Sequence, residues 1–112
     1  MSNKKVLFIV GPTAAGKSNL AINIALRVNG EIVNADSRLV YKNMDIGTSK
    51  PTPKQLSQVP HHLIDIKSPT EQYNLREYLT TANKTISNIL KKGKVPIIVG
   101  GTGQYIWALF EG

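Results

Sequence analysis

The stretch GPTAAGKS at residues 11–18 decides the fold of this chain. It matches the phosphate-loop pattern G-x-x-x-x-G-K-[ST] at every fixed position. Gly11 and Gly16 allow backbone angles that a Cβ would block, so the loop can curl its N–H groups around an anion at the start of a helix. Lys17 adds a positive charge for the outer phosphates, and Ser18 offers a hydroxyl to a Mg²⁺ ion on the same phosphates. A glycine-rich turn that binds nothing is disfavoured, because strand and helix patterns flank the loop on the correct sides.

The segments around this loop alternate between strand and helix patterns. Residues 6–10 form an apolar run typical of a strand buried on both faces, and residues 17–28 have one apolar helical face. Further strands are expected at residues 31–35, 61–66 and 95–99, further helices at 75–92 and 104–110, and a short coil of helix near 54–58. This alternation predicts an α/β fold, a P-loop NTPase-like parallel sheet with flanking helices.

The helix expected at residues 75–92 carries the clearest end signals. Asn74 and Glu77 have the spacing of a capping box, and Gly93 stops the helix. Lys91, Lys92 and Lys94 cluster at its end. Their charges fit either the negative end of the helix dipole or contact with RNA, and the sequence does not choose between the two.

The composition describes one small domain. The chain has 112 residues, no cysteine and a formal net charge of +7. The absence of cysteine excludes disulfides and thiolate metal sites, and the positive charge favours phosphate-rich partners such as nucleotides and RNA. No apolar run is long enough for a secretory core or a membrane span, so we expect a cytoplasmic protein without membrane contact.

Three polar segments follow expected strands: residues 11–18, 36–38 and 100–103. In parallel sheets, ligands bind at the carboxyl ends of strands, so these segments are candidates for one site. Asp36 could be a general base, a partner of Mg²⁺ or a turn residue that accepts backbone N–H bonds. The turn around Thr102 could present N–H groups and a hydroxyl to a ligand, or could merely connect a strand to a helix.

For the remaining histidine, aspartate and aromatic residues of interest, the sequence favours structural roles over chemical ones. His61 and His62 would point to opposite faces of a strand, so we expect them to be structural or to face a loop, and not to bind a metal. Asp65 follows an apolar pair in a faint Walker-B-like pattern that carries little weight. Trp107 and Phe110 fall on an apolar helical stretch, and we expect both in the core and not in a platform on which bases stack.

Four segments together resemble the tRNA dimethylallyltransferase family in order and spacing. They are GPTAAGKS at 11–18, NADSRLVYKNMDIGTSKP at 34–51, VPHHLIDI at 59–66 and VGGTGQYIWAL at 99–109. The resemblance covers nearly the whole chain, and its second and fourth segments are far more specific than the phosphate loop. It implies transfer of a dimethylallyl group from dimethylallyl diphosphate to N6 of the adenosine 3′ of the tRNA anticodon.

The resemblance also implies roles for individual residues. The phosphate loop would hold the donor diphosphate through Gly11, Pro12, Thr13, Ala14, Ala15, Gly16, Lys17 and Ser18, with Mg²⁺ at Ser18. Asp36 matches the general base that accepts a proton from the attacking amine, and Thr102 matches a second catalytic contact near the target base. The segment Asp36, Ser37, Arg38 and Leu39, together with Thr102, matches the family's tRNA contacts. For a phosphate loop of this kind we also expect binding of nucleotides, including ATP.

Length separates this chain from the family. Residues 1–112 correspond to the P-loop-containing N-terminal core, and the helical tRNA-binding region is absent, so tRNA binding is expected to be weak or absent. A catalytically incomplete phosphate-binding fragment and an isopentenyltransferase acting on free adenine nucleotide are the alternatives; ordinary small-molecule kinases fit less well. A shortened parallel sheet exposes a strand edge, and we expect weak stability or self-association there.

Overall fold

A computed structural model describes residues 5–10, 17–36, 39–41, 51–68, 73–100 and 104–111, without the side chains of residues 17, 18, 104, 110 and 111. Its centre is a parallel sheet of four strands in the order β1-β4-β2-β3. The strands are β1 (Leu7–Val10), β2 (Gly30–Asn34), β3 (His61–His62) and β4 (Val95–Gly100). The α/β parallel sheet expected from the sequence is therefore confirmed, and β1 lies at one edge of it.

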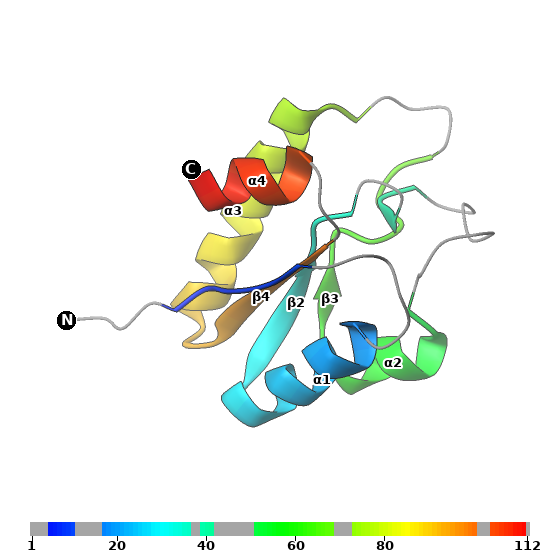
Figure 1. Ribbon diagram of the computed structural model, residues 1–112, viewed down its shortest axis with the longest axis vertical. Coiled ribbons are helices and arrows are strands. Elements are labelled where there is room, and N and C mark those ends of the chain that lie inside the picture. Colours follow the sequence, from blue (N-terminus) through cyan, green and yellow to red (C-terminus); the bar gives the residue numbers. More distant parts are fainter. Residues whose placement is uncertain are drawn as a thin grey trace.

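Helices cover both faces of this sheet (Figure 1). The helices α1 (Lys17–Val28) and α2 (Pro53–Gln58) lie on one side, and α3 (Leu75–Lys91) and α4 (Gln104–Glu111) lie on the other. Each parallel strand needs a crossover before its neighbour, and the helices supply these connections. Among the described residues, no helix has the length and apolar character that a membrane span requires.

The two faces of β4 organise two apolar clusters. Ile97, paired with Leu7 and Ile32, faces α1 and packs with Ala21 and Ala25. Ile98 faces α3 and α4, and its cluster contains Val33, Tyr78, Ala82 and Ile106. Ile97 and Ile98 have no exposed surface, and complete burial of such a side chain stabilises the fold by about 1.5–3 kcal/mol.

Helix α3 begins with the capping box expected from the sequence. The Asn74 side chain accepts the Glu77 N–H at 2.8 Å, and the Glu77 carboxylate accepts the Asn74 N–H at 3.5 Å. Tyr78, with no exposed surface, stacks on the Tyr105 ring of α4 with centroids 4.0 Å apart. This stack joins the two helices that cover the same face of the sheet.

The strand expected at residues 61–66 is the least accurate of the expected elements, because β3 contains only His61 and His62. Leu63 and Asp65 have φ angles of 67° and 57°, in the left-handed region that ends an extended strand. The segment still runs beside the continuation of β2, since Tyr41 forms an isolated parallel bridge with Lys67. The other expected strands and helices are present, and each of their ends lies within one residue of the expected position. Helix α2, for example, begins at Pro53, one residue before the expected start.

Candidate active site

The carboxyl ends of all four strands lie at one edge of the sheet, because every pairing is parallel. They end at Val10, Asn34, His62 and Gly100. The phosphate loop follows β1, the Asp36 segment follows β2, and the glycine-rich turn follows β4. The topology therefore brings the strand ends from which the three candidate segments leave to the same edge, which is where parallel α/β sheets bind their ligands.

Several of the expected site residues lie outside the described residues. These are Gly11, Pro12, Thr13, Ala14, Ala15 and Gly16 of the phosphate loop, and Ser37, Arg38 and Thr102. Lys17 opens α1 and Ser18 follows it, so both backbones stand in the first helical turn, although their side chains are not described. Their roles remain predictions.

Asp36 stands two residues beyond the end of β2 and is held through its backbone. Its N–H donates to Asn34 Oδ1 at 2.9 Å, and its carbonyl accepts from Asn34 Nδ2 at 2.9 Å and from the Leu39 N–H at 3.1 Å. This is the turn geometry that an Asn side chain forms with the backbone two residues on. The side chain that forms this turn is therefore that of Asn34, and the role of the Asp36 carboxylate stays a prediction.

The segment after Asp36 is tied to the segment after β3. The Leu39 carbonyl accepts the Asp65 N–H at 3.0 Å, and the Val40 carbonyl accepts the Ile66 N–H at 2.8 Å. The Leu39 side chain is buried, with 8% of its surface exposed. The two left-handed residues, Leu63 and Asp65, turn the chain at this point, and such backbone angles in non-glycine residues cluster at functional sites.

A close approach of two backbones holds the tips of β2 and β4 together. A Cβ added to Gly100 would lie 2.7 Å from the Ala35 carbonyl oxygen. Glycine is therefore required at the end of β4, two residues before Thr102 in the sequence. This packing sets the separation between the β2 and β4 tips.

A charge cluster at the opposite, amino-terminal edge was not anticipated from the sequence. Glu31, 1% exposed, accepts from His62 Nε2 and Lys92 Nζ, each at 2.7 Å, and lies 3.4 Å from Lys94 Nζ. Burial alone would raise the pKa of Glu31, but the hydrogen bonds and charges of Lys92 and His62 outweigh it and lower the pKa from 4.5 to about 2. Lys92 and Lys94 thus pair with Glu31 inside the fold. Neither of the two interpretations of these lysines from the sequence, the helix dipole and contact with RNA, included this pairing.

The two histidines have structural contacts, as expected. His61 Nδ1 lies 2.9 Å from the Val59 carbonyl, and His62 binds Glu31. Burial lowers the pKa of His61. Within the described part of the chain, no three His, Asp or Glu side chains are grouped closely enough to hold a metal ion.

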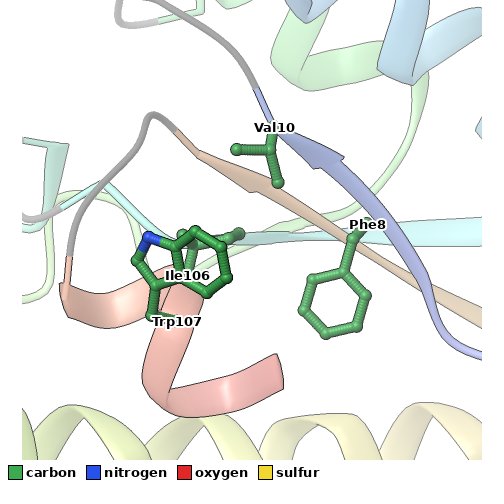
Figure 2. A pocket seen from close by; sticks show the side chains of 4 residues that line it. All are labelled: Phe8, Val10, Ile106 and Trp107. Carbon is green, nitrogen blue, oxygen red and sulfur yellow. The ribbon is translucent and has the colours of Figure 1, made fainter. Parts of the chain in front are cut away.

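An apolar hollow of about 300 Å³ lies between β1 and α4, lined by Phe8, Val10, Ile106 and Trp107 (Figure 2). Trp107 is 57% exposed, so the expectation that it belongs to the core is wrong. Ile106 belongs to the core cluster and Tyr105 packs against it, whereas Trp107 lines the hollow and stays mostly exposed. The side chain of Phe110 lies outside the described ones. Among the described residues that line the hollow, all four side chains are apolar apart from the indole N–H of Trp107.

The chain is similar to a known protein family and to several of its members. The model of the family described as "IPP transferase" matches residues 39–112. The chain is 54% identical, over all of its length, to the tRNA dimethylallyltransferase of Lactococcus lactis, and 51% identical over 97% of its length to that of Chloroflexus aurantiacus. It spans only 38% and 37% of those relatives, so each of them is more than two and a half times as long.

Solved structures agree with the sequence comparison. The tRNA isopentenylpyrophosphate transferase of Bacillus halodurans superposes with a TM-score of 0.89 at 45% identity, over 96% of this chain and 35% of that one. A eukaryotic dimethylallyltransferase acting on tRNA gives a TM-score of 0.86 at 39% identity, over 93% of this chain and 26% of that one. From the family match, the relatives and the shared fold together, the chain belongs to the IPP transferase family.

Proposed function

We propose that this chain is the donor-binding N-terminal part of a tRNA dimethylallyltransferase. The observation that carries the proposal is that β1, β2 and β4, which precede the three candidate segments in the sequence, end at one edge of a parallel sheet. Relatives about 50% identical over nearly all of the chain, named for this reaction, support it. A reaction on tRNA would place the protein in the cytoplasm.

In the proposed reaction, N6 of the adenosine on the 3′ side of the tRNA anticodon attacks the first carbon of the dimethylallyl group. A C–N bond forms, the C–O bond to the diphosphate breaks, and the diphosphate leaves with the bonding electrons. Asp36 accepts the proton that the amine loses, and Thr102 contacts the target base. Because the amine is a weak nucleophile, positioning contributes at least as much as basicity.

The phosphate loop would receive the leaving diphosphate. The backbone N–H groups of residues 11–16 would bind it, apart from Pro12, which has no N–H. Thr13 would face the donor, and Lys17 would add charge at the start of α1. Ser18, in the first turn of α1, would provide a hydroxyl oxygen, which is the type of ligand that Mg²⁺ prefers. When bound, Mg²⁺ would supply further neutralisation of the diphosphate.

The tRNA would contact Asp36, Ser37, Arg38, Leu39 and Thr102. The relatives' additional length, about two thirds of each, would supply the helical grip on the anticodon stem-loop. For the 112-residue polypeptide alone, we therefore expect donor binding with weak tRNA binding and without repeated turnover. A chain that transferred the group to free adenine nucleotide would instead turn over without tRNA.

Calorimetry with dimethylallyl diphosphate and Mg²⁺ tests the donor site directly. We expect saturable binding that exceeds the binding of ATP and is lost in Lys17→Ala. Stronger binding of ATP accompanied by phosphoryl transfer would refute the prenyl-donor assignment and favour a kinase. Activity needs the longer protein, and replacing the matching N-terminal residues of the Lactococcus lactis enzyme with this chain would provide it, because the two are 54% identical over the whole segment.

A further inference from the structure

Asn34, the last residue of β2, is a buried amide whose side chain is fully engaged. Only 3% of its surface is exposed. Its Nδ2 donates to the carbonyls of Asp36 and Leu63, both at 2.9 Å, and its Oδ1 accepts the Asp36 N–H at 2.9 Å. A buried polar side chain is costly unless its hydrogen bonds are made, and here both amide hydrogens and the oxygen are used.

These bonds fix the two backbone polar groups of one residue. Asn34 binds both the N–H and the carbonyl of Asp36, while its bond to the Leu63 carbonyl anchors the same turn to the tip of β3. Few side chains can make this set of bonds: Asp has no donor, Ser is too short to reach both sides, and an aliphatic residue makes none. The amide therefore links the start of the Asp36 segment to two strands at once.

A second contact holds Asn34 itself, without touching Asp36. The buried Tyr78 hydroxyl of α3 donates to the backbone carbonyl of Asn34 at 2.7 Å. Tyr78 belongs to the core cluster, so this bond ties the end of β2 to the helix layer. It offers a matched control, because losing it removes a buried hydrogen bond at the same residue and leaves the Asn34 side chain in place.

We propose that Asn34 is a positioning residue that holds the backbone of Asp36 in the place from which its carboxylate acts. The inference rests on the proposed function, in which Asp36 is the general base. Asn34 is not expected to touch either substrate. Its contribution comes from confining the turn, since displacement of a catalytic group by about 1 Å can cost about 100-fold in rate.

The test uses the full-length enzyme that carries this chain in place of the Lactococcus lactis N-terminal segment. In Asn34→Ala we expect kcat to fall about 10- to 100-fold, while KM for dimethylallyl diphosphate changes by less than about threefold. In Tyr78→Phe we expect kcat within about threefold of the parent. Asn34→Ser should recover part of kcat, because a serine hydroxyl can accept the Asp36 N–H in the related turn.

Hydrogen exchange of the peptide that contains Asp36 gives a readout independent of turnover. We expect faster exchange there in Asn34→Ala and unchanged exchange in Tyr78→Phe. Equal losses of kcat in Asn34→Ala and Tyr78→Phe would overturn the proposal, because general destabilisation would then explain both. If Asn34→Ala does not fold, the comparison of Asn34→Ser with Tyr78→Phe decides by the same criterion.

Asp36→Ala separates this inference from the function on which it rests. If the Asp36→Ala enzyme keeps the parent rate, Asp36 is not the general base, and the positioning role of Asn34 is refuted as well. An inactive Asp36→Ala enzyme together with Asn34→Ala at the parent kcat removes only the positioning role. Both the base assignment of Asp36 and the positioning role of Asn34 are supported by a third outcome. In that outcome Asp36→Ala is inactive, and Asn34→Ala has a low kcat and faster exchange at Asp36.

Discussion

Replacing Glu31 with Gln removes the one charge that the buried cluster at the amino-terminal edge is built around. Glu31 is 1% exposed and binds His62 and Lys92 at 2.7 Å. Glutamine has nearly the same shape, so packing of β2 is retained. The change therefore isolates the charge and the charge-assisted hydrogen bonds, which are about twice as strong as neutral ones.

The magnitude follows from the pKa of Glu31. Burial opposes ionisation, but Lys92 and His62 lower the pKa from 4.5 to about 2. At about 1.4 kcal/mol per pH unit this corresponds to about 3 kcal/mol of folding free energy. Lys92 keeps 52% of its side-chain surface exposed, so solvent screens part of the interaction, and we expect about 2 kcal/mol.

The sign of the pH dependence follows from the same shift. Because the pKa is lower in the folded protein than in the unfolded chain, the ionised Glu31 stabilises the fold above the unfolded value of 4.5. That stability is lost as the pH falls toward the folded value of about 2. The parent should therefore exceed Glu31→Gln by about 2 kcal/mol near neutral pH, and the difference should shrink to nearly nothing at about pH 2.

Urea unfolding followed by far-ultraviolet circular dichroism, at a series of pH values, measures this difference. Glu77→Gln is the matched control, since Glu77 is exposed and Gln also fits its capping-box position. We expect its free energy of unfolding to follow the parent at every pH. If the parent and Glu31→Gln lose stability in parallel between about pH 5 and about pH 2, the reasoning about the buried charge is refuted.

Three further outcomes are expected. Lys92→Met leaves the Glu31 carboxylate with weaker partners and should lower the free energy of unfolding by about 1–2 kcal/mol near neutral pH, an effect that should vanish in the Glu31→Gln background. Gly100→Ala should cost about 1–3 kcal/mol in the same assay, because its Cβ would meet the Ala35 carbonyl at 2.7 Å; an unchanged midpoint would contradict the close approach. Trp107→Glu should reduce any self-association at the β1 edge in sedimentation velocity, and a parent that sediments as a monomer at every concentration would contradict that association.

The elements whose signals are local could be predicted well from the sequence. Helix α1 (Lys17–Val28) has the expected bounds, and α3 has its expected capping box at Asn74 and Glu77. Apolar periodicity and end residues lie within a few positions of one another, so both can be read along the chain. The short β3 was predicted less well, because nothing local signals the left-handed angles of Leu63 and Asp65.

The roles of Glu31 and Asn34 depend on contacts between distant residues. Lys92 is 61 positions from Glu31, while Leu63 and Tyr78 are 29 and 44 positions from Asn34. Part of the Asn34 signal was present, since an Asn two residues before an Asp at the end of a strand favours the turn observed. No comparable local signal distinguishes Glu31 from a solvent-exposed glutamate on a strand.

The sequence by itself determined the phosphate loop, the alternation of strands and helices and the resemblance to the family, because these depend on residues near one another in the chain. Only the tertiary structure decided that β4 lies between β1 and β2, and that β1 therefore forms an edge with Trp107 exposed beside it. It also decided that Glu31 is charged within the fold and that Asn34 holds Asp36. Strand order, burial and charge pairing arise from contacts across long loops, whose energies no local pattern contains.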